Sequence, residues 1–279
     1  GGKIYAEGTA TEPIVFTSDN KKSGDWGGVT IYGNAPIKAI NGAAKALSED
    51  GNNVYYGGDN PNDNSGSLKY VRVEYGGKKI GDGTSETNSL TFYSVGAGTT
   101  LENIVAYMGT DDGFEFFGGT VSAKNIVSYG NYDDSFDWQD AWSGQNNSNW
   151  YAYQTTIGNF GMEIEASGKA DNTAPKINGI TLIREANTKP ETAGSIEVSA
   201  IQFKKHGNGI FTNVLIDGYN DTAAVSSSSL DPGVLGVTYL VNNGSEWYDM
   251  DILFSDDPQG VGYNFDLFPT CDVISTPVP

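Results

Sequence analysis

Residues 101–138 read LENIVAYMGTDDGFEFFGGTVSAKNIVSYGNYDDSFDW, and the same pattern of side chains occurs twice within them. Val105 returns as Val127 and Phe114 returns as Phe136, in both cases 22 residues later. A constant period of this length, made of short apolar strands separated by turns, is typical of one coil of a β-solenoid. The sequence therefore predicts an all-β fold, and specifically a right-handed parallel β-helix.

Looser copies of this repeat occur along much of the chain. Its first half is repeated in segments that begin at Leu68, Ile177 and Ile210, and its second half in segments that begin at Asn88, Gly161 and Ala200. A β-sandwich is the alternative, but sandwiches do not repeat a string of side chains at a constant period. We therefore expect residues 1–220 to form the β-helix, and residues 221–279 to form C-terminal coils or a capping segment of the same domain.

Three stretches between the repeats are rich in Gly, Asn, Asp and Ser. They are residues 38–67, 139–149 and 184–199. A solenoid tolerates such insertions because each coil needs only the strands of its neighbours. We expect all three to leave the solenoid as irregular loops.

The chain is strongly acidic, with 16 basic and 35 acidic residues and a net charge of −19. This balance argues against nucleic acid as a partner, because a duplex-binding surface needs Lys and Arg to replace phosphate counterions. A divalent cation or a glycan suits the charge better. No segment approaches the ~20 apolar residues of a membrane-spanning helix. The chain opens at Gly1 in sequence that already resembles a strand, so we expect a trimmed N-terminus and any surface anchor to lie outside this chain.

The period also predicts which residues stack on one another. Coils of a parallel ladder lie about 4.8 Å apart, and side chains alternate between the two faces of each strand. The expected inward column is apolar: Phe114, Phe136, Met162 and Ile201. The residues between these strand positions are acidic, and we expect Glu115, Asp137 and Glu163 to form a row on the outer face.

Like charges at this spacing destabilise a sheet unless they are protonated or a cation lies between them. Further carboxylates precede two of the strands, and six residues form the candidate metal site: Asp112, Glu115, Asp133, Asp134, Asp137 and Glu163. Carboxylate oxygens are the ligands of Ca²⁺, which takes 6–8 of them. Zinc is disfavoured, because the chain has one His and one Cys, His206 and Cys271. A solvated acidic face is the alternative for the row, and a simple turn is the alternative for Asp111 and Asp133.

An aromatic-rich stretch gives a second candidate site. Aromatic rings alternate there with amides and carboxylates, an arrangement that suits the binding of sugars. The candidate ligand-binding residues are Gln139, Asp140, Trp142, Trp150 and Tyr151. Trp138 and Trp150 could instead fill the core, whereas we expect Trp142 to be exposed on a loop.

Residues 24–37, GDWGGVTIYGNAPI, resemble a signature of cell-surface β-helix proteins of Gram-negative bacteria. Residues 6–18, 68–75 and 112–120 resemble other parts of the same proteins, and the likeness covers roughly residues 1–220. These proteins are exported, and many are lipoproteins. The resemblance implies an extracellular or outer-membrane surface location.

Residues 133–137, Asp-Asp-Ser-Phe-Asp, resemble the calcium motif of the β-helical pectate lyases. In those enzymes calcium neutralises the uronate of the substrate, and a basic side chain removes the proton from C5. The next ladder position here is Glu163, where such an enzyme would have its base, although Lys169 and Lys204 lie nearby in the sequence. The resemblance therefore implies calcium binding without the catalytic base.

Three functions follow from these observations. The favoured one is a non-catalytic extracellular protein that binds a polysaccharide or another surface ligand on a calcium-stabilised β-helix, as a monomer or within a larger surface assembly. The second is a polysaccharide lyase-like enzyme, or a hydrolase that uses a carboxylate pair such as Glu163 and Glu165. The third is a structural or adhesive spacer, because a solenoid is rigid.

Overall fold

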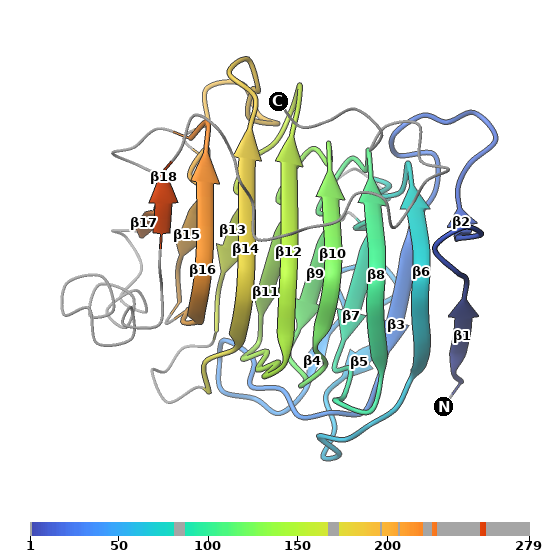
Figure 1. Cartoon of the computed structure of the whole chain (residues 1–279). Coiled ribbons are helices and arrows are strands. Elements are labelled where there is room, and N and C mark those ends of the chain that lie inside the picture. The colour runs from blue at the N-terminus through green and yellow to red at the C-terminus, as the bar shows by residue number, and fades with distance from the viewer. Residues whose placement is uncertain are drawn as a thin grey trace.

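The fold is built from two long parallel sheets that face one another, as the computed structural model shows (Figure 1). The model describes residues 2–80, 87–166, 173–195, 197–205, 207–219, 225–227 and 252–254. Within these residues the regular elements are all strands, and no helix long and apolar enough to cross a membrane is found among them. The predicted parallel β-helix is confirmed.

Sheet A is the nine-stranded sheet, and sheet B is the seven-stranded sheet. Sheet A contains β1 (Ile4–Glu7), β6 (Gly66–Glu74), β8 (Thr100–Tyr107), β10 (Ala123–Tyr129), β12 (Asn147–Gln154), β14 (Lys176–Arg184), β16 (Ile210–Asp217) and β18 (Ile252–Phe254), and β2 (Ile14–Phe16) also pairs with β6. Sheet B contains β3 (Val29–Tyr32), β7 (Leu90–Tyr93), β9 (Phe114–Phe117), β11 (Phe136–Gln139), β13 (Met162–Ile164), β15 (Ile201–Phe203) and β17 (Val225–Ser227). From β6 onward the chain alternates between the two sheets, so each coil contributes one strand to sheet A and one strand to sheet B.

The register of the coils is the one that the repeat predicts. In sheet A, Val127 pairs with Val105, and in sheet B, Phe136 pairs with Phe114 on one side and with Met162 on the other. Ile201 continues this column on β15. Side chains that are equivalent in the sequence repeat are therefore neighbours in space.

The core lies between the two sheets and is rich in aromatic rings. The predicted inward column of Phe114, Phe136, Met162 and Ile201 is fully buried. Trp142 stacks on Phe116 at 4.7 Å between ring centroids. Burial of each such side chain stabilises the fold by about 1.5–3 kcal/mol, so this column is a main source of stability.

A line of asparagines bends the strands of sheet A. Asn103, Asn125 and Asn149 have φ values of 57°, 53° and 55°, in the left-handed region that Asn tolerates better than most residues. The side-chain amide of Asn125 donates to Asn103 Oδ1 at 2.9 Å, and that of Asn149 donates to Asn125 Oδ1 at 2.8 Å. The first three residues of β8 therefore lie on a different facet of the coil from its last four.

The predicted insertion 38–67 does not leave the solenoid as an irregular loop. Residues 33–58, which include most of it, contain the antiparallel pair β4 (Ala46–Leu47) and β5 (Tyr55–Tyr56) and fold back on the outer face of sheet B. Tyr56 packs against Tyr93 and Phe117, with ring centroids at 4.8 Å and 5.8 Å, and its hydroxyl donates to Asp140. We refer to residues 33–58 as the cover segment.

The other two predicted insertions differ from one another. β11 ends at Gln139 and β12 begins at Asn147, so residues 140–146 of the predicted stretch 139–149 connect the two strands, and the residues on either side belong to the strands. The coil is longer here than the repeat, because Val127 pairs with Tyr151, 24 positions later. The stretch 184–199 does lie between strands β14 and β15.

Only part of the predicted C-terminal segment is described. β17 adds a rung to sheet B and β18 adds a rung to sheet A. The other residues of 221–279 lie outside the described part, and the boundary at residue 220 stays a prediction.

Candidate metal centre

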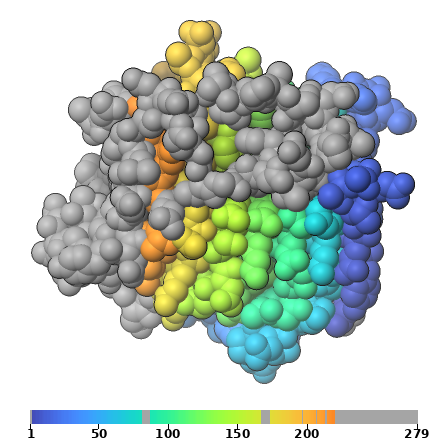
Figure 2. Space-filling model, viewed as in Figure 1, coloured from blue at the N-terminus to red at the C-terminus, as the bar shows by residue number. Residues whose placement is uncertain are grey.

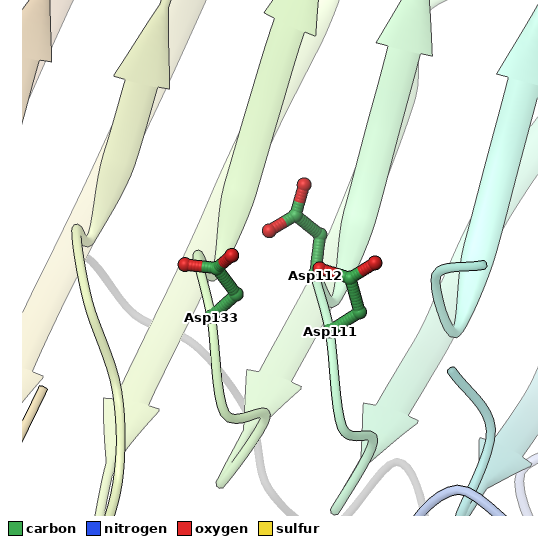
Figure 3. Close-up of side chains that lie close together, drawn as sticks. All are labelled: Asp111, Asp112 and Asp133. Atoms are coloured by element: carbon green, nitrogen blue, oxygen red, sulfur yellow. The ribbon is translucent and has the colours of Figure 1, made fainter. Parts of the chain in front are cut away.

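The acidic residues come together on two neighbouring coils. Asp111 and Asp112 lie on the turn before β9, and Asp133 lies on the equivalent turn before β11 (Figure 3). On the strands, Glu115 pairs with Asp137, and Asp137 pairs with Glu163. The predicted stacking of the row is confirmed.

The predicted exposure of the row is wrong for two of its members. Glu115 is 7% exposed and Asp137 is 8% exposed, whereas Glu163 is partly buried. Glu115 accepts hydrogen bonds from the side-chain amides of Asn88 and Gln139. The cover segment also packs on the adjacent column of sheet B, so a solvated acidic face does not describe these carboxylates.

Three groups of carboxylates have oxygens within 4.8 Å of one another. They are Asp111–Asp112–Asp133, Asp112–Glu115–Asp137 and Asp134–Asp137–Glu163. The groups form a continuous chain, because the first two share Asp112 and the last two share Asp137. All six predicted metal ligands belong to this chain. Asp111, which the sequence left as an ordinary turn residue, joins them.

Some of these oxygens have structural roles in the turns. Asp112 Oδ1 accepts a hydrogen bond from Asp134 N at 2.8 Å, and Asp134 Oδ1 accepts one from Phe160 N at 2.7 Å. One oxygen of each of these two residues therefore holds the turn of the next coil. Asp137 Oδ1 differs, because it is buried and has no hydrogen-bond partner among the described residues. A buried polar atom without a partner is costly, and this one faces other carboxylates.

Burial makes it unfavourable for these acids to ionise. It raises the pKa values of Asp112, Glu115, Asp134 and Asp137 well above the usual range, and neighbouring carboxylates raise them further. For Asp133, burial together with Glu191 raises the pKa to about 7. Protonation or a bound cation would relieve the cost of these buried charges.

One end of the row already has a positive charge. Lys204 Nζ lies 2.5 Å from Glu163 Oε2 and 2.8 Å from Glu165 Oε1, and Lys205 Nζ lies 2.7 Å from Glu165 Oε2. Burial alone would lower the pKa of Lys204, but Glu163 and Glu165 outweigh it and raise the pKa above its usual value. The group Asp112–Glu115–Asp137 has no such counter-ion within it, and it has the greatest need of a cation.

The donor set suits a hard divalent cation. All ligand atoms of the three groups are carboxylate oxygens, which match Ca²⁺ in chemistry and are ill suited to zinc. Asp137, whose Oδ1 has no hydrogen-bond partner in the described part of the chain, stands at the centre of the row between Glu115 and Glu163. His206 and Cys271 lie outside the described residues.

The predicted aromatic ligand site is not on the surface. Trp142 and Trp150 are fully buried, and Trp142 Nε1 donates to Val121 O at 3.0 Å. The expectation that Trp142 is exposed is wrong, because its ring turns inward from the β11–β12 turn and packs within the aromatic core. Tyr151 and Asp140 are also buried, and Asp140 accepts from Tyr56. Gln139 donates to Glu115 at 3.3 Å. Tyr151 packs in a separate apolar cluster of sheet A with Val105 and Val127.

The comparisons with known proteins identify a family. Residues 1–251 match the family model of the pectate-lyase-like β-helix domain, and the chain therefore belongs to this family. No curated protein and no solved structure is found to match the chain.

Proposed function

We propose that this protein, as a member of that family, is a non-catalytic extracellular β-helix that is stabilised by calcium and binds a polysaccharide or another surface ligand. The observation that carries the calcium part is Asp137 Oδ1, a buried carboxylate oxygen without a hydrogen-bond partner among the described residues. Asp112, Glu115 and Asp137 each have a carboxylate oxygen within 4.8 Å of those of the other two. A calcium ion in this group would convert three repelling buried acids into ligands.

The metal is proposed for a structural role. The carboxylates lie in the turns and strands of successive coils, so an ion held by them would fasten one coil to the next. Asp112 comes from the turn before β9 and Asp137 from β11. Binding to the folded state alone stabilises it by RT ln(1 + [L]/Kd), which is about 2.7 kcal/mol when free calcium is 100 times Kd.

The position of Lys204 supports the non-catalytic part. A general base works best with a pKa near the operating pH, which for a lysine means a lowered value. Lys204 is instead held by Glu163 and Glu165, and its pKa is raised. A lysine in this ion pair neutralises the row and is poorly suited to remove a proton from a substrate.

The ligand class and the location are proposed from the family and the composition. The likeness of the family to pectate lyases, which act on a polysaccharide, supports a polysaccharide as the ligand class. The acidic composition and a calcium-dependent fold both suit the extracellular space, where free calcium is abundant.

Thermal unfolding of the purified chain tests the calcium part. The melting temperature is measured in EGTA, in excess calcium and in the same concentration of magnesium. We expect calcium to raise the midpoint by about 5–10 °C, from about 2.7 kcal/mol and 2–4 °C per kcal/mol, and magnesium to have a smaller effect. Equal midpoints in EGTA and calcium would exclude a structural calcium site.

Incubation with polygalacturonate in calcium tests the non-catalytic part. Cleavage by a lyase leaves unsaturated sugar ends that absorb ultraviolet light. We expect no increase in absorbance, and a steady increase that disappears in the Lys204→Ala variant would establish a lyase instead.

A further inference from the structure

A polar facet lies on the outer face of sheet A. It is formed by the strand residues that precede the asparagine bend, which are Thr100–Glu102 on β8, Ala123 and Lys124 on β10, and Asn147 and Ser148 on β12. In Figure 2 the strands β6 to β14 lie side by side across the lower front of the molecule, in colours from cyan to yellow. The outward side chains of this facet stack in register, as Lys124 does with Glu102 and Ser148.

A groove follows this facet along the axis of the helix. Its first part is a hollow of about 490 Å³ that extends from Asn62, before β6, across the starts of β8, β10 and β12 to Thr173, before β14. Its second part is a hollow of about 270 Å³ that continues from Gln145 across β14 to Thr212 on β16. Gln145 lines both parts. The groove thus crosses six coils, which at about 4.8 Å per coil is a length of roughly 24 Å.

The lining of the groove is mostly uncharged and polar. It presents hydroxyls and amides from successive coils, as at Thr100, Ser122 and Asn146. Its charged side chains include both signs: Glu102 is acidic, and Lys124 and Lys176 are basic. In a chain with a net charge of −19 this surface is unusual for lacking an acidic excess. Hydroxyls and amides that both donate and accept hydrogen bonds match the hydroxyls of a sugar.

An exposed aromatic ring lies in line with the groove. Tyr5 on β1 pairs with Ser67, which is buried, and Ser67 pairs with Thr100, so these positions belong to one column. Tyr5 is 68% exposed, the kind of open ring that stacks on the face of a pyranose. It extends the column beyond the end of the hollow that Asn62 and Thr100 line.

We propose that this groove binds a linear polysaccharide that lies along the helix axis, with about one sugar for each coil and with Tyr5 stacked on a sugar at the N-terminal end. The repeat of the coils, about 4.8 Å, is close to the length of one sugar unit in an extended chain. A regular polymer therefore meets the same kinds of polar groups at each step. This inference rests on the proposed polysaccharide ligand and gives it a place, on a surface that does not include the acidic row.

Affinity electrophoresis of the full chain tests the groove. The probes are soluble linear polysaccharides, namely xylan, glucomannan, mixed-linkage β-glucan, alginate and polygalacturonate, each in calcium. We expect at least one of them to retard the wild-type chain. Tyr5→Ala should weaken that binding roughly threefold to tenfold, the usual worth of an aromatic contact. Tyr55→Ala is the matched control, because Tyr55 is 71% exposed on the hairpin of the cover segment, and it should bind as the wild type does.

A second variant tests the floor of the groove without an aromatic ring. Thr100→Leu combined with Asn146→Leu removes a hydroxyl and an amide from the lining, and we expect it to abolish the retardation. A melting midpoint close to that of the wild type shows that each variant is folded. Normal binding by both groove variants would overturn the groove while leaving the proposed ligand class intact. Failure of every polysaccharide to retard the wild-type chain would overturn both.

Discussion

Replacement of Asp137 by asparagine should stabilise the metal-free protein and reduce the stabilisation that calcium adds. Asp137 is 8% exposed, pairs with Glu115 on one side and Glu163 on the other, and has a buried oxygen without a partner among the described residues. Asparagine has nearly the same shape but no charge. Asp137→Asn therefore removes a repulsion from the metal-free protein and a ligand from the calcium-bound protein.

The size of both effects follows from the geometry. Oxygens of Asp137 and Glu115 lie within 4.8 Å, where two full charges repel by roughly 3.5 kcal/mol at an effective dielectric constant of ~20. Burial raises the pKa values of both acids and favours their neutral forms, which weakens the repulsion, so we expect Asp137→Asn to stabilise the metal-free protein by about 1–3 kcal/mol. A 10–100-fold loss of calcium affinity removes ~1.4–2.7 kcal/mol from the stabilisation that excess calcium adds.

Differential scanning fluorimetry of both proteins in EGTA and in excess calcium measures the two effects. The midpoint of the variant should lie a few degrees above that of the wild type in EGTA, and calcium should raise it by several degrees less than it raises the wild-type midpoint. Glu12→Gln is the control, because Glu12 is exposed on the turn before β2, and it should change neither midpoint. A calcium-induced rise in midpoint as large in Asp137→Asn as in the wild type would refute the reasoning.

Three further predictions concern the core, the cover segment and pH. Trp142→Ala should destabilise the fold by about 3–5 kcal/mol in urea unfolding, because the ring is fully buried, and a change below 1 kcal/mol would mean that Trp142 is exposed after all. Tyr56→Phe removes the hydroxyl that bonds to Asp140 and should speed hydrogen exchange in the cover segment, with a loss of about 1–2 kcal/mol; unchanged exchange there would count against this anchor. The calcium-induced rise in melting temperature should grow from about pH 4 to about pH 7. The reason is that the pKa of an acid such as Asp133 is raised to about 7 in the folded protein. Protonated Asp133 stabilises the metal-free fold at a pH below the pKa of the unfolded state, and this contribution is lost as the pH rises toward 7. A calcium effect that shrinks over this range would contradict the assignment of the carboxylates as ligands.

The sequence predicts the fold well because its repeat is a local pattern with a direct meaning in space. Two residues 22 positions apart, such as Val105 and Val127, become neighbours as soon as one coil closes on the next. The order Glu115, Asp137, Glu163 follows from the same rule, and so does the inward column that begins at Phe114.

The burial of the row does not follow from the repeat. It depends on segments that approach from elsewhere in the chain, as Asn88 does when its side-chain amide donates to Glu115, 27 residues away. The contact between Tyr56 and Asp140 joins residues 84 positions apart, and the 22-residue repeat does not predict it. The exposure of Trp142 is predicted wrongly for a related reason. A tryptophan in a turn can face solvent or the core, and the packing of its ring on Phe116 determines that it faces the core. Calcium itself stays a prediction.

Coils that stack in register make the length of this molecule adjustable in whole turns. Excision of residues 103–124 would join Glu102 to Asn125, which stands in the same place on its coil as Asn103, and every column would remain continuous. Loss of a single strand residue would instead turn apolar side chains outward and charged ones inward. A gene for such a protein can therefore grow by the duplication of one coil or shrink by the loss of one coil. Each such step changes the length of the solenoid by about 4.8 Å, while its facets keep their chemistry.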